Sequence, residues 1–135
     1  MKKFLIILSL FLLSGIRLFA QEDDNDGNEK IRDKMTEFIQ KRMNLTKSES
    51  EKFAPVFLRY FREWRQTLRE SKGLPGLDRQ QKIIELRLRY RNDFKVIVGE
   101  NRSNEIYRHQ DIFIRELQTL RKDRLENIPT RRFRQ

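Results

Sequence analysis

The stretch that decides the fold is residues 44–68, NLTKSESEKFAPVFLRYFREWRQTL. Thr46 is followed three residues later by Glu49, the signature of a capping box, in which each side chain accepts a hydrogen bond from the other residue's backbone N–H. Apolar side chains then recur every three or four residues, as they do on one face of an α-helix. The members of this stripe are Phe53, Phe57, Tyr60, Trp64 and Leu68. The pattern predicts a helix that begins at Thr46 and runs to about Ser71.

A row of arginines falls on the opposite side of this predicted helix. Its members are Arg59, Arg62, Arg65 and Arg69. Charges in such a row often form no more than a solvated helix face. Alternatively, they form a basic surface that binds acidic or unfolded polypeptides, because guanidinium groups pair with carboxylates and stack on aromatic rings. The pattern leaves both interpretations open.

Pro55 stands inside this helix, past the first turn where proline is tolerated. It has no N–H to donate to the Glu51 carbonyl, and its ring crowds that turn, at a cost of about 3 kcal/mol if nothing relieves it. We therefore expect a kink or bulge near Glu51 that lets the helix curve around its partners.

Three other segments have the apolar spacing of amphipathic helices. The first is residues 29–44. After a loop over residues 72–78, Asp78 is expected to cap a helix over residues 79–98, and a last helix follows over residues 100–125.

Apolar residues on the last two of these helices predict how they pack. Ile84 and Leu88 lie to one side of the main stripe of their helix, so that helix is expected to touch a second surface. The expected inner face of the last helix is Ile106, Phe113, Leu117 and Leu120. No stretch alternates with period two, so the sequence predicts an all-α domain of four helices over residues 29–126.

Both ends of the chain differ from this domain. MKKFLIILSLFLLSGIRLFA, residues 1–20, has the basic start, short apolar run and small final residue of a secretory signal peptide. An uncleaved anchor is the alternative, although the run is short for a membrane span. Residues 21–28 are expected to be an acidic linker and residues 127–135 a basic tail. The leader predicts export to the periplasm.

The net charge of +10 limits the classes of binding partner that we expect. In the cytoplasm such a charge would suggest nucleic acid. Behind a secretory leader it favours anionic membrane surfaces, lipopolysaccharide or acidic protein segments instead, with no nucleic acid. The chain has no cysteine, so no disulfide can stabilise the fold, which must rest on apolar packing.

The sequence offers little material for chemistry at a reactive centre. It has one histidine and neither a Gly-rich phosphate loop nor a nucleophile elbow. His109 is expected to be a solvated surface residue that cannot join Asp111 in a metal site. Acids such as Glu63 and Glu105 are expected in surface ion pairs. We therefore predict a protein that is not an enzyme and holds neither a metal nor a cofactor.

In their order and spacing these motifs resemble the Spy/CpxP-like periplasmic proteins with an LTxxQ motif, above all the Bacteroidetes branch labelled "sensor of ECF-type sigma factor". The matching motif residues are Leu45, Thr46, Glu49, Phe53, Pro55 and Phe57. Glu49 replaces the glutamine of LTxxQ, and FAPVF matches an aromatic-Pro-Val-aromatic run. Phe94-Lys95, Ile106-Tyr107 and Phe113–Leu117 match the second half of the pattern, so that the likeness covers residues 30–125.

The resemblance implies that helical hairpins pair into a cradle-like antiparallel homodimer, for which a monomeric four-helix bundle is the alternative. It also implies an envelope-stress accessory protein that binds unfolded or acidic periplasmic proteins on the surface formed by Arg59, Arg62, Arg65 and Arg69. An alternative role is as a sensor in an ECF-type sigma-factor or metal-responsive system that acts through a membrane-bound regulator. A third is binding to an anionic membrane surface.

Overall fold

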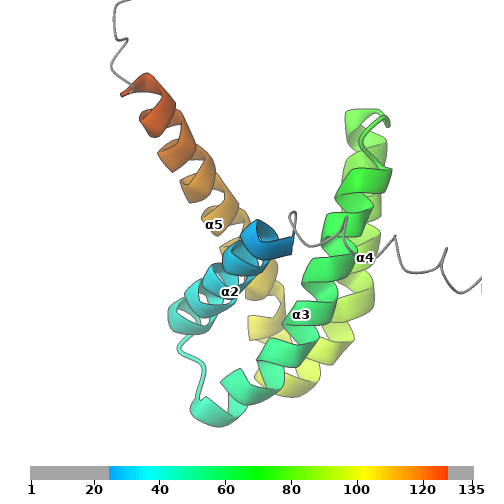
Figure 1. The fold of residues 1–135 in the computed structure, drawn as a ribbon. Helices are drawn as coiled ribbons and strands as arrows, with labels where there is room; N and C mark the ends of the chain where they lie inside the picture. The colour runs from blue at the N-terminus through cyan, green and yellow to red at the C-terminus, as the bar shows by residue number, and fades with distance from the viewer. Residues whose placement is uncertain (1–24, 128–135) are drawn as a thin grey trace, which may run out of the picture. The chain divides into compact units, whose positions relative to one another are not determined.

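The computed structural model describes residues 25–127, which form four α-helices and no strand (Figure 1). The helices are α2 (Asn25–Arg42), α3 (Lys47–Glu70), α4 (Gly76–Val98) and α5 (Glu100–Glu126). The predicted all-α fold of four helices is confirmed. The expected signal peptide, residues 21–24 of the linker and residues 128–135 of the tail lie outside the described residues. Within residues 25–127, no helix combines the length and the apolar character needed to cross a bilayer.

The chain divides into two compact units, and the boundary between Lys34 and Met35 falls inside α2. The described part of the first unit is residues 25–34, where Arg32 and Asp33 form an ion pair at 2.7 Å. The helix begins at Asn25 rather than at Glu29, so part of the expected acidic linker is helical. Extending an existing helix needs no new nucleus, which makes such an extension easy.

The start of α3 has the predicted capping box. The Glu49 N–H donates to Thr46 Oγ1 at 3.1 Å, and the Thr46 N–H donates to Glu49 Oε1 at 3.2 Å. The predicted aromatic stripe is confirmed at Phe53, Phe57, Tyr60 and Trp64, which are buried, but Leu68 is half-buried and Phe61, which was not predicted, is buried as well. The sequence therefore defined both the beginning and the buried face of this helix.

Pro55 does not interrupt α3, which is helical from Lys47 to Glu70. The bulge expected near Glu51 is absent from the helix, so that part of the prediction is wrong. Pro55 and Glu51 both lie on the exposed side. Water can there satisfy the carbonyl that proline leaves without a partner, which lowers the cost of the proline.

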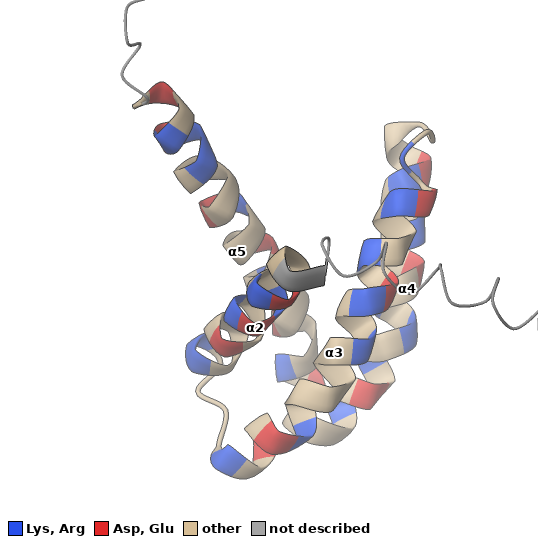
Figure 2. Ribbon diagram, in the orientation of Figure 1, with Lys and Arg blue, Asp and Glu red and all other residues tan. Residues whose placement is uncertain are grey.

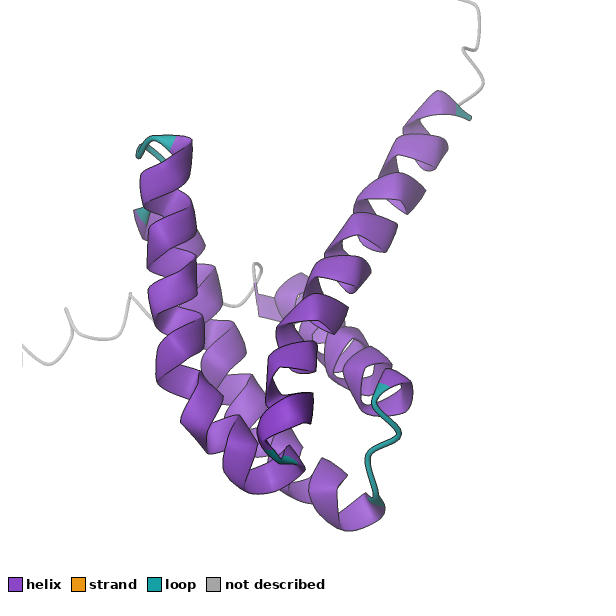
Figure 3. Ribbon diagram, turned by 180° about the vertical axis from the view of Figure 1, so that it is seen from behind, coloured by secondary structure: helices purple, strands orange, loops and turns teal. Residues whose placement is uncertain are grey.

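α3 and α4 lie side by side as an antiparallel hairpin (Figures 1 and 3). Ser71 closes α3 by donating from Oγ to the Thr67 carbonyl at 2.6 Å. α4 begins at Gly76 with Pro75 as its N-cap, so the prediction that Asp78 caps this helix was wrong. Proline is already fixed near the required φ and lacks the N–H that a helix start would leave unpaired, so it starts the helix early.

The core is a cluster of aromatic rings from α3, α4 and α5, centred on Phe94. The Phe94 ring is fully buried. Its centroid lies 5.6 Å from that of Phe53, 6.1 Å from those of Tyr60 and Tyr107, and 6.3 Å from that of Tyr90. All four pairs are tilted or edge-to-face, and rings prefer the edge-to-face arrangement to a face-to-face stack. Three helices therefore share one apolar core around one side chain.

Only the first half of α5 is buried. Its buried residues are Ser103, Ile106, Tyr107, His109 and Gln110. Phe113 and Leu117 are half-buried and Leu120 is 57% exposed, so the predicted inner face is wrong in its second half. Figures 1 and 3 show the reason: this half of α5 diverges from the α3–α4 hairpin.

Gly99 separates α4 from α5 with φ +86° and ψ 168°, a conformation essentially restricted to glycine. We expect Gly99→Ala to lower the free energy of unfolding by about 1–3 kcal/mol, measured by urea denaturation followed by circular dichroism. In Gly73→Ala the new Cβ meets open space among the described residues, and φ is not positive there. This control should stay within about 0.5 kcal/mol of the wild type. Equal losses of unfolding free energy in the two variants would contradict the conclusion that the backbone conformation at position 99 requires glycine.

Candidate partner-binding surface

The residues that carry the family resemblance have structural positions in this fold. Phe53 and Phe57 are fully buried, whereas Pro55 is exposed and Leu45 is half-buried. Glu49 caps α3 and also accepts a short hydrogen bond from Arg102 at the start of α5. The motif thus fixes the start of α3 and ties it to α5.

These contacts lower the pKa of Glu49, chiefly through the Thr46 backbone N–H and further through Arg102. The stabilisation is present above the ordinary pKa of 4.5 and is lost as the pH falls below it. Glu49→Gln cannot titrate there. We expect the difference in free energy of unfolding between wild type and this variant to shrink as the pH falls from 6 to 3. A difference that stays constant over this range would contradict the stabilising role of the Glu49 carboxylate.

The arginine surface, defined as Arg59, Arg62, Arg65 and Arg69, lies on α3 opposite its buried stripe, as predicted. Three of its members are exposed and Arg65 is half-buried. Basic residues recur along the length of α3 and α4 (Figure 2). Glu63, beside this surface, accepts from the Tyr90 hydroxyl and pairs with Arg89 of α4 at 3.4 Å. The expected ion pair of Glu63 therefore joins two helices.

A polar cluster at the meeting of α3, α4 and α5 is centred on Arg87. Its guanidinium donates to Asp111 at 2.6 and 3.3 Å, to Gln110 Oε1 at 3.2 Å and to the Tyr60 hydroxyl at 3.4 Å. The Tyr60 hydroxyl donates in turn to Gln110 Oε1 at 2.6 Å. The same guanidinium lies over the Tyr107 ring, 5.2 Å from its centroid. One arginine thus links all three helices of the core.

Burial and hydrogen bonding change the acidity of this cluster and its neighbours. Burial raises the pKa of Tyr60, although Arg87 opposes the shift. Burial disfavours the Arg87 charge, but Asp111 and Tyr60 outweigh it, so the pKa of Arg87 is raised. Burial, followed by the adjoining Glu63, raises the pKa of Tyr90 to about 12. These tyrosines therefore stay neutral and Arg87 stays charged at physiological pH.

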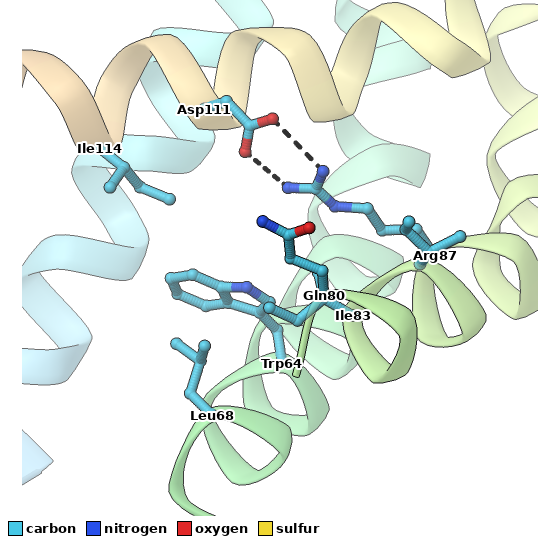
Figure 4. Close-up of a pocket in the computed structure, with 8 residues that line it drawn as sticks. Trp64, Leu68, Gln80, Ile83, Arg87, Asp111 and Ile114 are labelled. Atoms are coloured by element: carbon cyan, nitrogen blue, oxygen red, sulfur yellow. Dashed lines mark hydrogen bonds and ion pairs between the residues drawn. The ribbon is translucent and has the colours of Figure 1, made fainter. Parts of the chain in front are cut away.

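A pocket of about 420 Å³ opens beside this cluster. It is lined by Trp64, Leu68, Gln80, Ile83, Ile84, Arg87, Asp111 and Ile114. In Figure 4, Trp64 and Leu68 rise from α3, Asp111 and Ile114 descend from α5, and the Arg87–Asp111 pair forms one end. The size and the mixture of an apolar lining with a few polar groups suit the binding of an apolar side chain or small molecule.

The pocket continues into exposed surface on two sides. Ile84 is 55% exposed and Leu88, one turn further along α4, is 51% exposed. Their sequence spacing predicted a contact with a second surface, but no helix among the described residues covers them. On α3, Leu68 lies three residues after Arg65, and residues at this spacing are neighbours on a helix. The apolar pocket therefore adjoins Arg65, the half-buried member of the arginine surface, whereas the other three arginines lie further round α3 and do not line the pocket.

The arginine surface was predicted from the sequence, but the pocket was not. Trp64 and Leu68 were predicted as core, although they also line the pocket, and the roles of Arg87 and Asp111 were not anticipated. One signal was available: the hydroxyl of a tyrosine within an apolar stripe, such as Tyr60, needs a buried partner. That partner could not be identified without knowing which turns of α4 and α5 meet α3.

His109 contradicts the prediction of a solvated surface residue, because it is only 6% exposed. It lies one turn before Phe113, on the side of α5 that meets α2. Its neighbours in the sequence are polar, and for that reason the sequence suggested a surface position. Burial, then Arg42 and Arg108, lowers its pKa.

Within residues 25–127, no three histidine, cysteine or acidic side chains gather as metal ligands would. In comparisons with known proteins, no family model, curated protein or solved structure matches the chain.

Proposed function

We propose that this protein is a non-enzymatic periplasmic accessory protein that binds unfolded or acidic polypeptides. The arginine surface attracts the carboxylates of the bound chain, and the adjoining pocket receives one of its apolar side chains. The observation that carries the proposal is that one helix, α3, presents both the arginine surface and part of the open apolar pocket, with Arg65 next to the lining residue Leu68. An unfolded polypeptide presents both acidic and apolar side chains, whereas a folded partner hides most of its apolar ones.

The proposal also rests on the resemblance to the Spy/CpxP-like proteins, which implies weak capture of clients on a basic helical surface. Here that surface would be supplemented by Trp64 and Ile84 at the pocket. Arginine suits this role because one group can pair with carboxylates and stack on aromatic rings. We further propose that two copies pair as a homodimer, since Leu120 and Leu125 are 57% and 70% exposed on α5. Light scattering should then give twice the mass of the processed chain, by which we mean the chain without the expected signal peptide, residues 1–20.

An aggregation assay tests the proposed function. The processed protein should suppress the aggregation of a chemically unfolded acidic client at near-stoichiometric ratios. The combined variant Arg59→Glu, Arg62→Glu and Arg65→Glu should lose most of this suppression, because it turns attraction into repulsion. The matched control reverses three exposed cations near the end of α5, namely Arg121, Lys122 and Arg124. Suppression that survives the first variant, or that is lost equally in both, would contradict the proposal.

A further inference from the structure

The second half of α2 is held by an apolar contact in which α5 takes part. Met35, Ile39 and Met43 are 1%, 0% and 6% exposed. The Phe38 ring meets the Phe113 ring of α5 edge to face, with centroids 5.4 Å apart. One face of residues 35–43 is therefore buried, and the Phe38 ring beside it packs against α5.

His109 lies in that contact. It precedes Phe113 by one helical turn, and its Nδ1 atom is buried with no hydrogen-bond partner among the described residues. The charged groups that act on it are Arg42 from α2 and Arg108 and Glu105 from its own helix. The imidazole thus faces two cations and one anion. A proton on the ring would add a third positive charge to a site that is already buried and predominantly basic.

We infer that protonation of His109 opens the contact between residues 35–43 and α5. The contact is closed while the imidazole is neutral. Nδ1 has no acceptor within the described fold to receive a new N–H, so a charged imidazole must reach water or leave the contact. Opening would place Met35, Ile39 and Met43 in solvent. Mild acid would therefore increase the apolar surface of the molecule without unfolding its aromatic core.

The direction of the pH effect follows from the lowered pKa of His109. The unfolded chain binds this proton near pH 6.5, whereas the folded chain resists it to lower pH. The stability that the closed contact contributes is therefore complete above pH 6.5 and is lost as the pH falls below that value. Glu105 favours protonation, but Arg42 and Arg108 outweigh it.

Two measurements test the inference on the processed protein. His109 is the only histidine of the chain, so its imidazole proton signals give its pKa by NMR without ambiguity. The chain has no cysteine, so spin labels can be placed on Lys41→Cys and Glu116→Cys to report the distance between α2 and α5. We expect a pKa below 6.5 and a distance that lengthens and broadens with the same midpoint. A label pair at Arg62→Cys and Asn92→Cys, on the α3–α4 hairpin, should not respond.

Two variants separate this titration from that of the carboxylates. His109→Gln removes the proton site and should abolish the distance change between pH 7.5 and 4.5. Arg42→Gln removes one repelling cation and should move the midpoint to higher pH, whereas Arg121→Gln, further along α5, should leave it unchanged. A distance change that persists in His109→Gln, or a protonation of His109 without any change in distance, would overturn the inference.

Discussion

Replacing Phe94 by alanine is expected to lower the free energy of unfolding by about 3–5 kcal/mol, the usual cost of removing a fully buried aromatic ring. The loss should lie at the high end because the ring contacts aromatic side chains from α3, α4 and α5. These helices cannot all close over the cavity at once. Urea denaturation followed by circular dichroism gives the value.

The matched control for this variant is Val96→Ala, two residues further along α4, where the side chain is 89% exposed. It should change the free energy of unfolding by no more than about 0.5 kcal/mol. If Phe94→Ala does not fold, Phe94→Leu leaves a smaller cavity and should cost about 1–2 kcal/mol. A loss below about 1 kcal/mol in either variant at Phe94 would mean that the core is centred elsewhere.

Arg87→Met is expected to cost about 2–3 kcal/mol, because it removes the charged partner of Asp111 together with hydrogen bonds to Gln110 and Tyr60. Removing one partner of a fully buried ion pair costs about 3–5 kcal/mol. The lower figure applies here because Asp111 is 50% exposed and water can solvate it. The same variant removes the polar end of the pocket.

A double-mutant cycle with Asp111→Asn isolates the ion pair from the rest of the cluster. We expect Arg87 and Asp111 to be coupled by more than 1 kcal/mol, above the range of exposed pairs. Arg89 and Glu63 provide the control, since they form an exposed pair at 3.4 Å between neighbouring helices. Their coupling should lie between about 0 and 1 kcal/mol. Equal coupling in the two cycles would contradict the structural role of Arg87.

The sequence predicted those parts of the fold that depend on local spacing. The capping box at Thr46 and the aromatic stripe of α3 follow from residues a few positions apart; the capping box is confirmed, and so is the stripe up to Trp64. The bulge expected near Glu51 is absent because an exposed helix face tolerates the missing hydrogen bond. At α4, Pro75 begins the helix before Asp78 can cap it.

The remaining errors concern contacts between distant segments. Leu120 has the same helical spacing as Ile106, yet α5 leaves the hairpin before reaching it, so periodicity alone cannot tell which turns are covered. His109 is buried within the field of Arg42, a residue of α2 more than sixty positions earlier in the chain. The pocket beside Arg87 likewise depends on how three helices meet. The arginine surface could be predicted because it belongs to a single helix face.

Fluorescence of Trp64 tests the binding surface most directly, because it is the only tryptophan of the chain and lines the pocket. An acidic, tryptophan-free peptide that contains leucine and phenylalanine is titrated into the processed protein at low salt. The binding proposal predicts a saturable change in emission that weakens as salt is added and disappears when Arg59, Arg62 and Arg65 are changed to glutamate. Emission that stays constant throughout the titration, or a change indifferent to both salt and charge reversal, would contradict it.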